Sequence, residues 1–175
     1  MTCDCQSTSE PVAMPAKMQT RLVFGATAIA MGTLAVPLAL SAAAPTPQEV
    51  QALVERAVEH IHAVGRDRAL ADFNHPDGGF VDGELYVYCN DAAGTVIAHG
   101  GNPKLVGTNL LGWRDPDGKL PGAEMRRIAF TQGSGWLEFR WPNPATKRIE
   151  LKDAYVQKVD DSMMCGSGYY KANPP

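Results

Sequence analysis

Apolar residues recur at intervals of three and four between positions 47 and 64, which predicts an amphipathic helix with one buried face. Thr46 and Glu49 form the sequence pattern of a capping box, and Pro47 suits the first helical position. Gly65 is expected to end the helix. The apolar positions are Val50, Leu53, Val54, Ala57, Val58, Ile61 and Val64.

Strands are predicted where apolar and polar residues alternate with a period of two. Within 84–99 and within 135–170 the predicted strands are joined by short turns, so neighbours along the chain run antiparallel. The strands are 84–90, 95–99, 135–141, 149–159 and 162–170, and shorter helices are predicted at 66–73 and 121–132. This order predicts an α+β fold in which a five-stranded antiparallel sheet packs against the long N-terminal helix.

The N-terminal region has the pattern of a targeting segment. Residues 22–40 are nearly continuously apolar, follow Lys17 and Arg21, and precede the small residues 41–44. The stretch 22–44 carries no charge and is also long enough to span a bilayer. Residues 1–44 are therefore predicted to be a signal peptide or an N-terminal membrane anchor, and residues 45–175 a single exported domain.

Charge and cysteine content narrow the possible partners. The formal net charge is -3 and long runs of one sign are missing from the sequence, so neither a nucleic-acid partner nor a polybasic membrane patch is expected. Cys89 and Cys165 both lie in predicted strands. In an exported domain they either form a disulfide or serve as small buried apolar residues. Neither has a neighbourhood that favours a reactive thiol.

A series of short motifs occurs in order between residues 80 and 170. They are Phe80-x-x-Gly83, Asp91-x-x-Gly94-x-x-x-Ala98-His99, Asn102-Pro103-x-Leu105-x-Gly107, Gly133-x-Gly135-Trp136, Trp141-Pro142-x-Pro144, Lys152-x-x-Tyr155-Val156 and Gly168-x-Tyr170. Together, over residues 46–171, they resemble the single Cache domain of type 2. The resemblance implies a PAS-like, profilin-like extracytoplasmic sensor that binds small metabolites, often short carboxylates, between its sheet and covering loops.

Two departures from the family pattern leave the identity of the ligand open. His99-Gly100 stands where relatives often have His-Pro, and Phe139 stands where they often have an aromatic hydroxyl.

A site for a small carboxylate needs cationic or N–H donors and an apolar or aromatic wall. The resemblance gives Lys152 the role of the charge and Tyr155 that of a hydroxyl donor; the alternatives are a solvated lysine and a half-buried strand aromatic. Strand alternation puts Phe139 and Trp141 on the face opposite Trp136, so both sets line one pocket only if a bulge intervenes. The candidate ligand-binding residues are Lys152, Tyr155, Trp141, Phe139, His99, Trp136 and Tyr88. No cofactor or metal site is expected.

The sequence as a whole predicts an exported sensor domain that captures a small organic acid and signals through a partner protein. A membrane-bound signalling protein is a possible partner. No transmitter of its own is expected, because the chain ends at Pro175, a few residues beyond the last predicted strand. The expected location is the periplasm, with tethering to the inner membrane by residues 22–44 as the alternative. A second hypothesis is a PAS-like interaction module whose pocket is filled by its own aromatics. An enzyme is a remote alternative, because no nucleophile or metal motif is complete.

Overall fold

The computed structural model describes residues 44–171. The predicted signal peptide or anchor, apart from Ala44, lies outside the described residues. The helices are α1 (Pro47–Val64), α2 (Arg66–Asn74), the 3-10 turn η1 (Pro103–Leu105) and α3 (Pro121–Gln132). None of the helices in this described part has the length and apolar character needed to cross a membrane.

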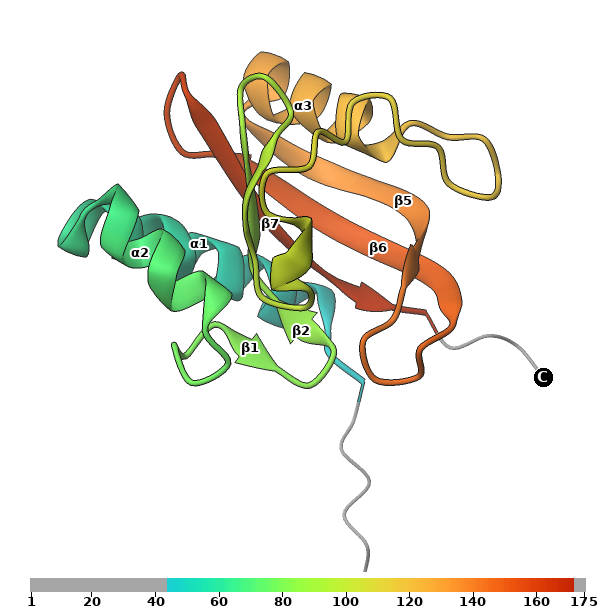
Figure 1. Cartoon of the computed structure of the whole chain (residues 1–175), viewed down its shortest axis with the longest axis horizontal. Coiled ribbons are helices and arrows are strands. Elements are labelled where there is room, and N and C mark those ends of the chain that lie inside the picture. Colours follow the sequence, from blue (N-terminus) through green and yellow to red (C-terminus); the bar gives the residue numbers. More distant parts are fainter. Residues whose placement is uncertain (1–43, 172–175) are drawn as a thin grey trace, which may run out of the picture. The chain divides into compact units, whose positions relative to one another are not determined.

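The strands form one main sheet and a short ribbon (Figure 1). They are β1 (Val81–Asp82), β2 (Leu85–Tyr86), β3 (Tyr88–Asp91), β4 (Val96–His99), β5 (Ser134–Pro142), β6 (Ile149–Lys158) and β7 (Met163–Tyr170). The main sheet has five antiparallel strands in the order β4-β3-β7-β6-β5, and β1 pairs with β2 in the ribbon. The predicted α+β fold is therefore confirmed.

The predicted strand 84–90 needs one correction, because it is divided at Val87. β2 leaves the main sheet to pair with β1, and the Val87 N–H donates to Phe80 O at 3.1 Å while its carbonyl accepts from Gly100 N at 2.9 Å. The alternation of side chains continues through the division. Tyr86 and Tyr88 contribute to one buried cluster, and Val87 and Cys89 to another.

Helix α1 forms as its sequence predicts. The Thr46 side chain accepts from the Glu49 N–H, and the Glu49 carboxylate accepts in return from the Thr46 N–H at 2.7 Å. The apolar face of α1 packs on β7 and β6, whereas α3 packs on β5 from the other face of the sheet (Figure 1). Each face of the sheet thus has its own core, and the core on the α3 face contains the pocket described below.

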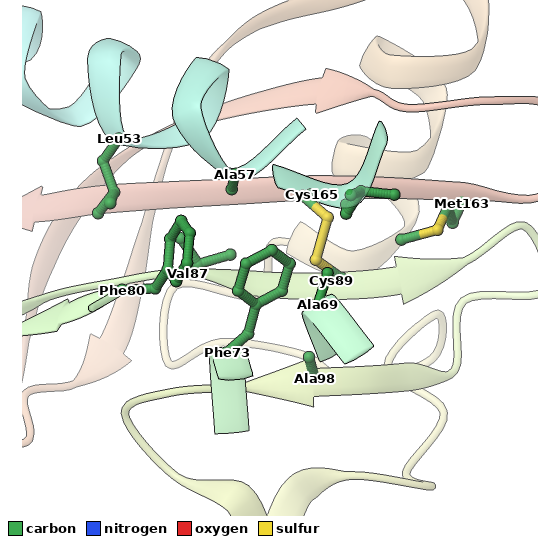
Figure 2. Close-up of a cluster of buried hydrophobic side chains, with 11 residues drawn as sticks. Leu53, Ala57, Ala69, Phe73, Phe80, Val87, Cys89, Ala98, Met163 and Cys165 are labelled. Atoms are coloured by element: carbon green, nitrogen blue, oxygen red, sulfur yellow. A yellow bond between two sulfur atoms is a disulfide. The ribbon is translucent and has the colours of Figure 1, made fainter. Parts of the chain in front are cut away.

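The core on the α1 face is crossed by a disulfide. Cys89 of β3 and Cys165 of β7 are directly opposite in register and are joined by an S–S bond. Figure 2 shows this bond among the side chains of Phe73, Phe80 and Met163. Tyr88 precedes Cys89 and Gly166 follows Cys165, and these two neighbours are also paired in register. Because side chains alternate along a strand, both positions face the other core.

The connection from β4 to α3 lies along the outer edge of β5. Asp115 accepts the Arg140 N–H at 3.0 Å, and Lys119 Nζ donates to Glu138 O at 2.9 Å. Asp117 also pairs with the Arg140 guanidinium at 3.0 Å. These contacts satisfy backbone groups that an edge strand would otherwise expose. They also hold the covering segment, residues 108–120, over the α3 face of the sheet.

Candidate functional site

A pocket lies between the sheet, α3 and the covering segment. Its lining comes from strands β2 to β6, from the covering segment and from the first turns of α3. The lining residues are Tyr86, Tyr88, Asn90, His99, Leu110, Trp113, Pro121, Gly122, Met125, Phe139, Trp141 and Lys152. The cavity volume is about 20 Å³, which is room for about one water molecule.

Lys152 of β6 is the one charged side chain that lines this pocket, and it is 1% exposed. Its Nζ lies 3.8 Å from the centre of the Tyr86 ring, 5.0 Å from that of Tyr170 and 5.7 Å from that of Tyr88. Ring faces attract a cation but do not replace its hydration shell. Burial therefore lowers the pKa of Lys152 to about 7, although the charge of Glu84 acts in the opposite direction.

Tyr88 has a buried hydroxyl that finds no hydrogen-bond partner within residues 44–171. Tyr86 and Tyr170 differ from it, because their hydroxyls lie 3.2 Å apart and Tyr170 donates onward to Pro142 O at 2.9 Å. Burial raises the pKa of Tyr88, so its hydroxyl keeps its proton and is a donor. Leaving such a donor unpaired costs roughly 1–3 kcal/mol. The Tyr88 hydroxyl is therefore a natural contact for a polar ligand atom.

His99 at the end of β4 supplies a further neutral donor. Its Nδ1 accepts the Asn102 N–H at 2.9 Å, which puts the ring proton on Nε2. Burial and the nearby charge of Lys152 lower the pKa of His99 to about 3, so the ring stays uncharged at neutral pH. The centres of the His99 and Trp141 rings lie 6.0 Å apart, and the rings are stacked.

Aromatic side chains close the rest of the pocket. Trp113 meets Trp141 edge-on with ring centres 4.8 Å apart, and Phe139 meets Trp141 at 6.0 Å. Met125 of α3 completes the apolar wall. The pocket thus combines one cation and neutral donors with apolar walls, an arrangement suited to a small anion with a short carbon chain.

Five of the seven predicted residues meet at this pocket: Lys152, Trp141, Phe139, His99 and Tyr88. The other two, Tyr155 and Trp136, lie outside this pocket, on the α1 face. Tyr155 packs with Val50 and Val54 of α1, and Trp136, 37% exposed, lies beside it with ring centres 5.3 Å apart. Because Tyr155 is three positions from Lys152 on a regular strand, the two side chains point to opposite faces.

Sequence reasoning missed several lining residues. Tyr86 is two positions from Tyr88 and shares its face, so strand alternation was the signal for it. Trp113 lies in a turn-rich segment where no periodicity fixes the direction of a side chain. Met125 and Asn90 looked like ordinary core and strand residues. Within the described part of the chain, no three His, Cys, Asp or Glu side chains are grouped to hold a metal ion.

Comparison with known proteins establishes the family. A sequence profile described as Single Cache domain 2 matches residues 39–163. The chain belongs to the single Cache domain 2 family. A relative of this Cache domain, Methyl-accepting chemotaxis protein McpP of Pseudomonas putida, is 36% identical over 90 residues, which are 51% of the chain and 16% of the relative. The chain therefore matches only a small part of that receptor's length.

Solved structures support the same assignment. A "Periplasmic sensor domain of chemotaxis protein" is 32% identical with a TM-score of 0.64, covering 71% of this Cache domain's chain and 94% of its own. A structure titled "Structural basis for carboxylic acid recognition by a Cache chemosensory domain" is 27% identical with a TM-score of 0.61, covering 71% and 92%. A methyl-accepting chemotaxis protein of Vibrio parahaemolyticus, 20% identical with a TM-score of 0.63 and coverage of 70% and 86%, shares the fold.

Proposed function

We propose that this Cache domain senses a small monocarboxylate, which binds in the pocket through Lys152, Tyr88 and His99. One observation carries the proposal. The buried Lys152 takes part in none of the ion pairs among residues 44–171. It shares the pocket with the buried Tyr88 hydroxyl, which has no hydrogen-bond partner among the same residues. Buried polar groups are normally satisfied. A carboxylate supplies acceptors for both groups at once.

The pocket favours one carboxylate group and a short chain. A second carboxylate would need a second cation to offset its desolvation, and Lys152 is the one cationic side chain that lines the pocket. The cavity of about 20 Å³ admits a ligand only when lining side chains move, so the smallest acids, with about one to three carbon atoms, require the least rearrangement.

The names of relatives support a sensory role outside the cytoplasm. The related structures are a periplasmic sensor domain of a chemotaxis protein and a Cache chemosensory domain described with carboxylic acid recognition. We place this domain in the periplasm, exported by residues 1–44 or tethered through 22–44, with a membrane-bound partner that reads its bound state. For the ligand to signal, it must favour one conformation or one partner-bound state over another.

Isothermal titration of the protein at pH 6 with formate, acetate, propionate, butyrate and succinate tests the proposal. We expect saturable binding of at least one monocarboxylate and weaker binding of succinate. Lys152→Met, which keeps the shape but removes the charge, weakens binding by at least about tenfold. Lys158→Gln, on the same strand but outside the pocket, binds like the wild type. The proposal is overturned if the folded wild type binds none of the acids or if Lys152→Met binds them equally well.

The small cavity also favours the second candidate, an interaction module without a small ligand. In that case the aromatic side chains themselves fill the space that a ligand would occupy. Thermal unfolding against a library of small metabolites separates the two, because a ligand that binds only the native state raises the melting temperature. A melting temperature that no metabolite raises favours the interaction module.

A further inference from the structure

The surroundings of Lys152 are apolar and aromatic, so the protonated side chain is poorly stabilised there. The inference drawn from this rests on the proposed function and extends it from the carboxylate to the proton. We infer that carboxylate binding is coupled to the uptake of a proton at Lys152, so that the domain reads the carboxylate and the proton together. Binding then weakens as the surroundings become alkaline.

The contacts of Nζ carry the inference. Nζ is packed over the Tyr86 ring at 3.8 Å, with the Tyr170 ring at 5.0 Å, and the side chain is 1% exposed. It takes part in none of the ion pairs formed among residues 44–171. Gly168 lies so close that a Cβ on it would meet Lys152 Cε at 2.8 Å, so the absence of a side chain at Gly168 makes room for the buried lysine.

The other groups around Lys152 that line the pocket stay uncharged near neutral pH. Burial raises the pKa of Tyr86 on β2, Tyr88 on β3 and Tyr170 on β7, so these hydroxyls stay neutral. His99 on β4 is also neutral, since its pKa is lowered to about 3. The remaining lining residues from β3, β5, α3 and the covering segment are uncharged: Asn90, Phe139, Trp141, Pro121, Gly122, Met125, Leu110 and Trp113.

Two carboxylates lie behind the pocket, and neither lines it. Glu84, in the turn between β1 and β2, accepts from Asn143 Nδ2 at 2.8 Å, and its charge favours the protonated lysine. The Glu150 carboxylate accepts hydrogen bonds from the side chains of Asn143, Thr146 and Arg148. Burial outweighs the charge of Glu84 and lowers the pKa of Lys152 to about 7. Lys152 is therefore the lining group that changes charge near neutral pH.

An arriving carboxylate supplies the missing counter-charge. The neutral amine takes one proton, which the acid form of the buffer releases, and the resulting ammonium pairs with the carboxylate, so one anion and one proton enter together. With a pKa of about 7 for the free pocket, the affinity falls by about tenfold for each pH unit above 7, or by about a hundredfold between pH 6 and pH 9.

Titration calorimetry with sodium acetate and sodium propionate as probes, from pH 5.5 to pH 9, tests the inference on the intact protein. At each pH the titration is repeated in two buffers of different ionisation enthalpy, and the difference in heat gives the number of protons taken up. We expect close to one proton per carboxylate at pH 9, almost none at pH 5.5, and the fall in affinity given above.

Variants separate Lys152 from other groups. Lys158→Gln has the wild-type pH dependence, and His99→Gln lowers the affinity but keeps the slope. Lys152→Arg, whose guanidinium stays charged, loses the slope if it binds; a Lys152→Arg slope equal to the wild type contradicts the inference. Constant wild-type affinity without proton uptake overturns the inference and leaves the proposed function standing. No binding of acetate, propionate, formate or butyrate at any pH overturns both.

Discussion

At the scale of the residue, Lys152 is a group whose burial opposes folding. Its folded pKa of about 7 lies below the ordinary value of 10.5. Between these values the unfolded chain holds a proton that the folded domain has lost, so stability rises with pH through this window and is lowest below pH 7. The domain thus bears a stability cost at the position where its ligand is proposed to bind.

Replacing the charge removes this cost. Lys152→Met should be more stable than the wild type at pH 6, and the wild type should approach it with a slope of up to about 1.4 kcal/mol per pH unit between pH 7 and pH 9. Urea unfolding at pH 6, 7, 8 and 9 measures the difference. Measurements stop at pH 9 because the tyrosines with raised pKa destabilise the fold at higher pH. Stability curves that run parallel in the two proteins would show that Lys152 does not titrate as described.

At the scale of the element, strand alternation decides which side chains reach the pocket. β5 presents Phe139 and Trp141 to the α3 face and Trp136 to the α1 face, and β6 separates Lys152 from Tyr155 in the same way. Alternation is a local property, so the sequence was sufficient to assign residues to faces. A family motif that contains both Lys152 and Tyr155 does not by itself show that the two side chains lie on opposite faces.

A matched pair of substitutions on β5 tests this division. Trp141→Ala removes part of the pocket wall and should weaken carboxylate binding by about tenfold. Trp136→Ala removes a side chain of the same size from the opposite face and should leave binding unchanged. Calorimetry on both variants makes the comparison. A larger effect of Trp136→Ala would place the ligand on the α1 face.

The parts of the site that the sequence did not predict come from non-local geometry. The antiparallel sheet, the capping box of α1 and the faces of β5 and β6 follow from local patterns. The division of the first strand at Val87 depends on contacts with Phe80 and Gly100. Trp113 lies two residues before Asp115, whose carboxylate accepts the N–H of Arg140 in β5, 25 residues further along the chain. Local periodicity carries no information about such contacts.

At the scale of the whole molecule, the disulfide joins strands that are far apart in sequence. Cys89 and Cys165 are separated by 76 residues, and the bond holds β3 beside β7 at the middle of the sheet. A cross-link that closes a loop of this length restricts the unfolded chain strongly. The two halves of the domain are thus covalently tied at the back of the pocket.

Removing this cross-link should lower the stability of the domain without changing its fold. We expect Cys89→Ala together with Cys165→Ala to reduce the free energy of unfolding by about 4 kcal/mol. Urea unfolding of this variant, compared with the wild type before and after reduction, measures the loss. If the reduced and oxidised wild type unfold at the same urea concentration, the bond contributes nothing to stability.

The covering segment has a double attachment, since residues 113–119 both close the pocket and bind the outer edge of β5. Any opening that draws Asp115 away from β5 frees the Arg140 N–H at the same moment. The rate at which the Arg140 amide exchanges with deuterium would then report how often the covering segment opens. Exchange is slow while the segment stays on β5 and faster when the segment opens more often.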